Sequence, residues 1–179
     1  MDFVMFHYKS TPKYFFAVIF SLLLSACAST ESKLAVPYVV ELRAANNVNQ
    51  SMGSRASPVK VTVFELKSSA AFERSDFFAL QNNPQQALGD QLLDINSLIL
   101  RPNGVDTIKG SGNIQAKVLG IIAAYRDINN SQWRLVLDLP EAKTTNFYKF
   151  WQFSPDEVRI VIDVNQASIL VNQQQGREE

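Results

Sequence analysis

Short runs in which apolar and polar residues alternate recur along the chain, and this pattern constrains the fold most strongly. In one run, Val59, Val61 and Val63 alternate with polar residues. A period of two places alternate side chains on one face of an extended chain, so each run predicts a half-buried β-strand. Turn sequences such as Arg-Pro-Asn-Gly at 101–104 separate the runs. Short strands joined by turns predict an all-β fold, an antiparallel β-sandwich.

Two of the expected strands have apolar residues on both faces. The segment 114–125 has the composition of a central strand, and Gly120 within it predicts a bulge or a close approach of backbone. Phe64 and Leu66 lie on the face opposite to Val59, so either a bulge shifts the register or that end is covered on both sides. The expected strands are 36–44, 58–66, 92–100, 105–109, 114–125, 133–139, 158–164 and 167–171.

A short helical insertion is expected between two of these strands, over residues 68–89. Asp76 is placed to cap one short helix, and Asn83, which a proline follows, is placed to cap a second. Phe77 and Phe78 are interpreted as core residues that hold the insertion against the sheet. A ligand-binding role for these phenylalanines is the alternative.

The first residues of the chain have the pattern of a secretory signal. Lys9 and Lys13 precede the apolar run 14–24, which is shorter than the roughly 20 residues that span a bilayer. The run ends in Leu-Ser-Ala-Cys at 24–27, which resembles the lipobox of bacterial lipoproteins. The resemblance implies lipid attachment to Cys27, cleavage before it and acylation of the new amine. A plain signal peptide with a chance cysteine, or an uncleaved anchor, is the alternative.

Cys27 is the only cysteine of the chain, which favours the lipoprotein interpretation. An unpaired thiol is a liability in an oxidising compartment, and acylation removes it. Ala28 stands where an Asp would argue for retention in the inner membrane, so we expect lipid anchoring in the outer membrane on its periplasmic face. The expected organisation is a signal peptide over 1–26, an acylated cysteine and tether over 27–33, a β-sandwich over 34–172 and a mobile tail over 173–179.

The composition argues against enzymatic function. His7 is the only histidine, and it lies in the predicted signal peptide. The mature chain would then lack a histidine general base and a free thiol. We therefore expect no catalytic residues, cofactor, metal site or small-molecule substrate, and hydrolysis by two carboxylates is the remaining enzymatic alternative. Basic and acidic residues both number 17, so no basic surplus predicts nucleic-acid binding.

Two segments are candidates for binding a partner. Residues 46–57 form a polar loop that is long for a connection between paired strands. Long loops on a sheet scaffold often carry binding, and a slack connection is the alternative. The segment 147–153 is either an exposed partner surface or a cover over an open end of the sheet. Its aromatic residues are Phe147, Tyr148, Phe150, Trp151 and Phe153.

Four stretches in order along the chain resemble the TssJ family, the outer-membrane lipoproteins of type VI secretion systems. The first is the lipobox that ends at Cys27. The loop after the first strand and the aromatic segment 141–153 depart from the family pattern. The other matching stretches are Ser-Pro-Val-Lys-Val-Thr-Val-Phe-Glu-Leu-Lys at 57–67, Asp-Phe-Phe-Ala-Leu at 76–80 with 88–90 and 98–102, and Ala-Ala-Tyr-Arg at 123–126 with Trp-Arg at 133–134.

The resemblance implies a transthyretin-like β-sandwich with an added helical element and a role that is not enzymatic. The implied partner is the periplasmic C-terminal domain of the TssM-type inner-membrane component, bound through the loop between the first two strands. Met and Arg are enriched at interfaces, so Met52 and Arg55 are the expected anchors. A lipoprotein binding module of another envelope complex is the alternative. The residues predicted to bind the partner are Asn49, Gln50, Ser51, Met52, Gly53, Ser54 and Arg55.

Overall fold

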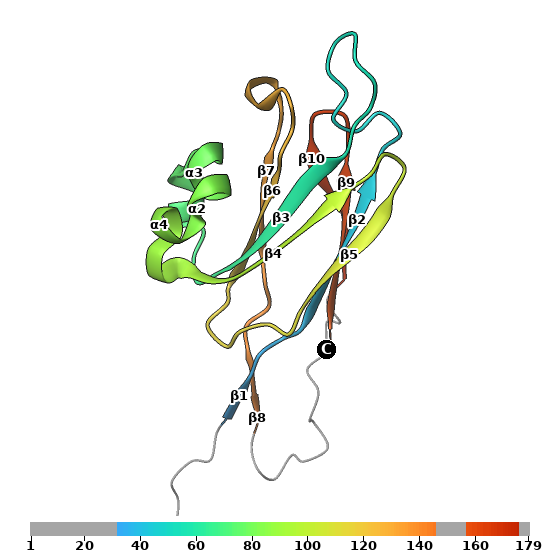
Figure 1. Cartoon of the computed structure of the whole chain (residues 1–179). Helices are drawn as coiled ribbons and strands as arrows, with labels where there is room; N and C mark the ends of the chain where they lie inside the picture. The colour runs from blue at the N-terminus through green and yellow to red at the C-terminus, as the bar shows by residue number, and fades with distance from the viewer. Residues whose placement is uncertain (1–31, 146–156, 176–179) are drawn as a thin grey trace, which may run out of the picture. The chain divides into compact units, whose positions relative to one another are not determined.

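Two four-stranded sheets pack face to face in a computed structural model, which describes residues 32–145 and 157–175 (Figure 1). The strand order is β10-β9-β2-β5 in the first sheet and β4-β3-β6-β7 in the second. The predicted signal peptide, Cys27 and the aromatic segment 147–153 lie outside the described residues. The first sheet comprises β2 (Tyr38–Ala44), β5 (Val105–Gly110), β9 (Val158–Val164) and β10 (Ile169–Gln175), and the second comprises β3 (Val59–Leu66), β4 (Leu92–Leu100), β6 (Val118–Ala123) and β7 (Arg134–Asp138).

The core between the sheets is built from every second residue of the inner strands. Val40 and Leu42 of β2 are fully buried, as are Val61 of β3, Ile121 of β6 and Ile160 of β9. Each fully buried aliphatic side chain of this size contributes about 1.5–3 kcal/mol relative to an exposed one. The predicted sandwich is confirmed, and its core follows from the period-two pattern.

One strand pair differs from the predicted antiparallel arrangement. β2 and β9 run parallel, with Tyr38 opposite Val158 and Ala44 opposite Val164. Ahead of β2, β1 (Ser32–Leu34) pairs antiparallel with β8 (Lys143–Thr145). Alternation is the same in parallel and antiparallel strands, so the sequence pattern does not distinguish them.

The described strands also extend beyond the predicted sandwich at both ends. β1 begins at Ser32, inside the segment predicted as a tether. β10 continues to Gln175, whereas the sandwich was expected to end at 172. Gln174 pairs with Ile160, and its side-chain amide donates to the backbone oxygen of Asp138 at 3.1 Å. The residues at the end of β10 are polar and do not alternate with apolar residues, so the sequence pattern placed the end of the sandwich too early.

The predicted insertion packs against the outer face of the second sheet (Figure 1). The backbone amide of Ala79 donates to the Asp76 carboxylate at 2.9 Å, which confirms the predicted cap. Phe77 is buried as expected, but Phe78 is 60% exposed. None of the helices in the described ranges is long and apolar enough to cross a bilayer. The insertion comprises α2 (Ala70–Arg74), α3 (Phe77–Asn82), α4 (Pro84–Leu88) and the 3-10 turn η1 (Gly89–Gln91).

The insertion explains why β3 and β6 are apolar on both faces. Phe64 and Leu66 are buried beneath Phe72 of α2, and the pairing of β3 with β4 also shifts register beside Leu66. Both explanations offered by the sequence therefore apply. The ring of Phe72 lies so close to Gly120 that a Cβ there would be 2.8 Å from it. A close approach therefore exists at Gly120, but the Phe72 side chain makes it and not the second backbone that the sequence had suggested.

A buried polar pair joins the two sheets at the end near β1. The hydroxyl of Tyr38 in β2 donates to Oε2 of Glu65 in β3 at 3.3 Å. Glu65 is only 3% exposed, and its Oε1 atom has no hydrogen-bond partner among the described residues. Burial raises the pKa of the Glu65 carboxyl above its ordinary value, and the nearby charge of Asp94 acts in the same direction.

Candidate partner-binding site

The loop 46–57 connects β2 of the first sheet to β3 of the second and projects beyond the strand ends (Figure 1). Met52 at its tip is fully exposed, and Gly53 and Arg55 are also exposed. These three residues have the accessibility that a partner contact needs. Their role in binding stays a prediction.

Asn49 has a different position from the one that the sequence suggested. It is 5% exposed and adopts a positive φ of 53°. Its side-chain nitrogen donates to the Pro58 oxygen at 2.9 Å, and its side-chain oxygen accepts from the backbone amide of Arg126 at 2.8 Å. Asn tolerates this backbone conformation better than most residues. Asn49 therefore holds the loop in place and is not available for direct contact.

The connection between β9 and β10 holds the loop by hydrogen bonds. The backbone amide of Asn49 donates to the Gln166 oxygen at 3.1 Å. The Gln166 side chain donates to the backbone oxygen of Gln50 at 3.1 Å and accepts from the Asn47 side chain at 3.3 Å. These bonds join residues far apart in sequence, so no local pattern could have revealed them.

The remaining predicted residues form a small hydrogen-bonded turn within the loop. The Ser54 backbone amide donates to the Ser51 oxygen at 3.0 Å, and the Ser54 hydroxyl donates to the same oxygen at 2.8 Å. The Gln50 side chain donates to the Ser54 oxygen at 3.0 Å. Gly53 has a φ of 72°, which favours glycine. The turn presents Met52 outward on a fixed backbone.

A hollow of about 200 Å³ lies between this loop and two neighbouring connections. Its other walls come from the connection between β6 and β7, which includes the 3-10 turn η2 (Ile128–Asn130), and from the turn before β10. The Tyr125 hydroxyl donates to the Ser168 oxygen at 2.7 Å, and burial raises the pKa of this hydroxyl. Tyr125 and Arg126 belong to a stretch that resembles the family, but the sequence predicted none of the residues lining this part as a site. These residues are Tyr125, Arg126, Asp127, Asn130, Gln166 and Ala167.

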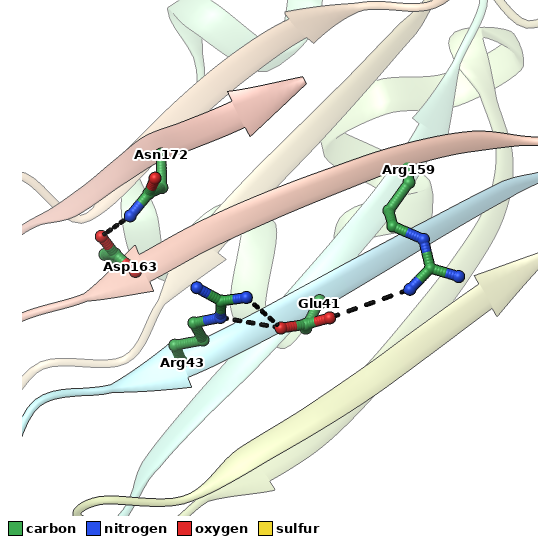
Figure 2. Close-up of polar contacts among 5 residues, drawn as sticks. All are labelled: Glu41, Arg43, Arg159, Asp163 and Asn172. Carbon is green, nitrogen blue, oxygen red and sulfur yellow. Dashed lines mark hydrogen bonds and ion pairs between the residues drawn. The ribbon is translucent and has the colours of Figure 1, made fainter. Parts of the chain in front are cut away.

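Ion pairs on the outer face of the first sheet form a second polar region (Figure 2). Arg43 contacts Glu41 at 2.7 Å, and Arg159 lies 3.9 Å from the same carboxylate. Asn172 donates to Asp163 at 2.6 Å. These groups pair with one another at the solvent-exposed surface, where an ion pair contributes about 0–1 kcal/mol to stability. Within the described ranges no group of three His, Cys, Asp or Glu side chains is placed to hold a metal ion.

Comparison with known proteins places the chain in a family. The model of the type VI secretion lipoproteins, described by the names VasD, EvfM and TssJ, matches residues 37–167. The chain therefore belongs to the type VI secretion lipoprotein family. Members of this family are structural, membrane-bound lipoproteins and not enzymes. The predicted family is thus confirmed. A comparison with curated protein sequences gives no match.

Solved structures agree with this assignment. The lipoprotein TssJ1 from Pseudomonas aeruginosa is 30% identical, with a TM-score of 0.67 over 80% of this chain and 99% of that chain. Lip from Serratia marcescens, a membrane-bound component of the type VI secretion system, is 35% identical, with a TM-score of 0.69 over 76% of this chain and 97% of that chain. A chain in a structure described as the TssM C-terminal domain from EAEC shares the fold at 21% identity, with a TM-score of 0.60 over 79% of this chain and 99% of that chain.

Proposed function

We propose that this lipoprotein anchors the type VI secretion membrane complex to the outer membrane. A lipid on Cys27 holds it in that membrane, and loop 46–57 binds the periplasmic C-terminal domain of the TssM-type inner-membrane component. The family match over residues 37–167 carries this proposal. A structure described by the name of the TssM C-terminal domain contains a chain of the same fold, which supports the choice of partner.

The placement of the chain entry and of the loop supports this role. Ser32, the first described residue, begins β1 at one end of the sandwich, and loop 46–57 lies at the other end (Figure 1). β2 runs between these ends, and its seven residues span roughly 20 Å at about 3.3 Å per residue. A molecule held by its N-terminal end thus presents the loop away from that attachment.

Lipid anchoring also lowers the affinity that the protein contact needs. A single acyl chain gives only marginal membrane binding, at about 0.8 kcal/mol per buried CH₂, whereas several chains on one cysteine give durable anchoring. An anchored lipoprotein and a partner that reaches it from the inner membrane share a small volume. Their effective concentration is then high, so a modest interface suffices.

Truncation of Met52 tests the loop as the contact. We expect Met52→Ala to weaken binding of the chain from residue 28 onward to the periplasmic part of the TssM-type protein by about tenfold, because fully desolvated interface anchors commonly cost more than about 1 kcal/mol when truncated. Isothermal titration calorimetry measures this change. Ile114→Ala is the matched control, since Ile114 is an apolar residue that is 52% exposed and lies in the connection between β5 and β6.

The outcomes separate the site from the function. Equal affinity for Met52→Ala and the unchanged chain would reject Met52 as an anchor while leaving the partner in place. Absence of binding by the unchanged chain at micromolar concentrations would instead contradict the proposed partner.

A further inference from the structure

Three arginines lie at the loop end of the sandwich, each on a different connection. Arg55 lies in loop 46–57, Arg101 in the turn between β4 and β5, and Arg126 in the connection between β6 and β7, and all three are exposed. This end carries the loop, the turns and the hollow described above (Figure 1). No sequence motif links these residues, because the fold alone brings them to one end.

Hydrogen bonds fix these connections to the first part of the loop and to the residues that precede it. The backbone amide of Ala44 donates to the Gly104 oxygen at 2.9 Å, and that of Asn103 donates to the Ala45 oxygen at 3.4 Å. The Arg126 backbone is bonded to the side chain of Asn49 at 2.8 Å. The backbone segments that carry the arginines are therefore held together by hydrogen bonds, which reduces the conformational entropy lost on binding.

The three guanidinium groups have no ion-pair or hydrogen-bond partner within residues 32–145 and 157–175. Among the other arginines of the described residues, Arg43, Arg134 and Arg159 have such partners, whereas Arg74 has none. Arg43 pairs with Glu41, and Arg134 donates to the backbone oxygens of Phe72, Glu73 and Ser75 and lies 4.7 Å above the Trp133 ring. The loop end thus carries cations that the sandwich itself does not neutralise.

The carboxylates near this end already accept hydrogen bonds from their own segments. Both oxygens of Asp127 accept from the Asn130 side chain at 3.0 Å. Asp106, close to the start of β5, accepts from the backbone amide of Thr107 at 2.8 Å. Loop 46–57 contains no acidic residue, and the turn 165–168 contains no charged residue. Neutral donors leave the negative charges of Asp106 and Asp127 in place, so the three arginines exceed these two carboxylates by one positive charge at the loop end.

We propose that Arg55, Arg101 and Arg126 form a docking surface for an acidic face of the partner, with Met52 seated in an apolar depression between the partner's carboxylates. This inference rests on the proposed function and adds the chemistry of the partner surface. The guanidinium fork binds carboxylates with two parallel hydrogen bonds, and a methionine adapts to irregular apolar gaps. The surface lies at the end opposite to Ser32, where the chain arrives from its anchor, which favours a protein partner over the anchoring membrane.

Charge reversal tests the surface. The triple variant Arg55→Glu, Arg101→Glu and Arg126→Glu is compared with Arg74→Glu, Lys109→Glu and Lys117→Glu. The control residues are also exposed but lie on α2, on β5 and before β6. Both variants change the net charge equally. Calorimetry with the periplasmic part of the TssM-type protein uses the chain from residue 28 onward at about 50 mM and about 500 mM salt, because exposed charge pairs are screened at high salt.

We expect the loop-end variant to bind at least about a hundredfold more weakly at low salt and the control within about threefold of the unchanged chain, because like charges at an interface repel. The loop-end variant Arg55→Lys, Arg101→Lys and Arg126→Lys keeps the charge and loses the fork, so it should bind about tenfold more weakly. Circular dichroism checks that each variant is folded. At high salt the difference between the loop-end variant and the control should shrink.

Each other outcome has a defined meaning. Equal losses in both charge-reversal variants would assign the effect to net charge and overturn the docking surface. Unchanged affinity of the loop-end variant would do the same while leaving the proposed function intact. Partner-free binding to vesicles of anionic phospholipid, lost in the loop-end variant alone, would make the surface a membrane site and overturn the proposal. Absence of binding by the unchanged chain would contradict the proposed function first.

Discussion

Glu65 is a carboxyl-bearing residue placed between two sheets, where charge is costly. Tyr38 donates to one of its oxygens, and the other has no partner among the described residues. Because burial raises the pKa of Glu65, the native state keeps this proton to a higher pH than the unfolded chain does. Its stabilising contribution is complete below the unfolded pKa and is lost as pH rises through the folded pKa.

Glu65→Gln should remove this dependence, because an amide has the same shape and no charge. The difference in free energy of unfolding between the variant and the unchanged chain should move in favour of the variant as pH rises from about 4 to about 8, since the ordinary pKa of Glu is about 4.3. Urea denaturation at a series of pH values measures this difference. A difference that does not change with pH would show that Glu65 titrates as an exposed carboxyl does.

The burial of some single residues could not be predicted from the sequence. Asn49 and Met52 of loop 46–57 were both predicted to bind the partner, yet Asn49 is buried and Met52 is fully exposed. Phe77 and Phe78 are adjacent phenylalanines of one short helix, and only Phe77 is buried. In each case the deciding neighbour is a distant segment, such as the Arg126 backbone for Asn49. Residue type alone could not distinguish these environments.

At the scale of elements, the strands were predictable because half-buried strands require alternation. The helical insertion was predictable from Asp76 and from Asn83 with the proline that follows it, although the Asn83 side chain makes no capping hydrogen bond. Strand direction was not predictable for β9, because an alternating strand fits either orientation. The polar end of β10 was missed for a related reason. It is held by backbone pairing with β9 and by the Gln174 contact to β7, neither of which needs an apolar side chain.

Among the helices and strands, the cap of α3 has the clearest expected effect on the free energy of unfolding. Asp76→Ala removes the acceptor for the Ala79 amide at the start of this short helix. We expect a loss of about 0.5–2 kcal/mol in the free energy of unfolding, measured by chemical denaturation. Asp90→Ala is the control, since among the described residues the Asp90 carboxylate accepts only from the adjacent Gln91 side chain. A control that is as destabilising as Asp76→Ala would argue against the cap.

For the molecule as a whole, the lipid anchor is the decisive prediction. Cys27→Ser should leave the sandwich folded and release it from the membrane fraction, because a hydroxyl does not form the thioether. The apolar run 14–24 is shorter than the roughly 20 residues of a spanning helix, so it should not retain the chain. Cell fractionation followed by circular dichroism of the soluble protein checks both points.

Ser29→Ala, two residues after the cysteine, serves as the neutral control and should remain with the membrane. Retention of the Cys27→Ser chain in the membrane fraction would exclude the lipid as the sole anchor.

The path of β2 has a mechanical consequence. This strand leads from the β1 end of the sandwich directly into loop 46–57, with β5 and β9 on either side. Tension between an anchored N-terminal end and a partner held at the loop would run along the covalent backbone of β2. The hydrogen bonds between strands would carry little of that load. A secretion machine could then pull on this molecule without unfolding it, and the first parts to yield would be the lipid in its membrane or the contact at the loop.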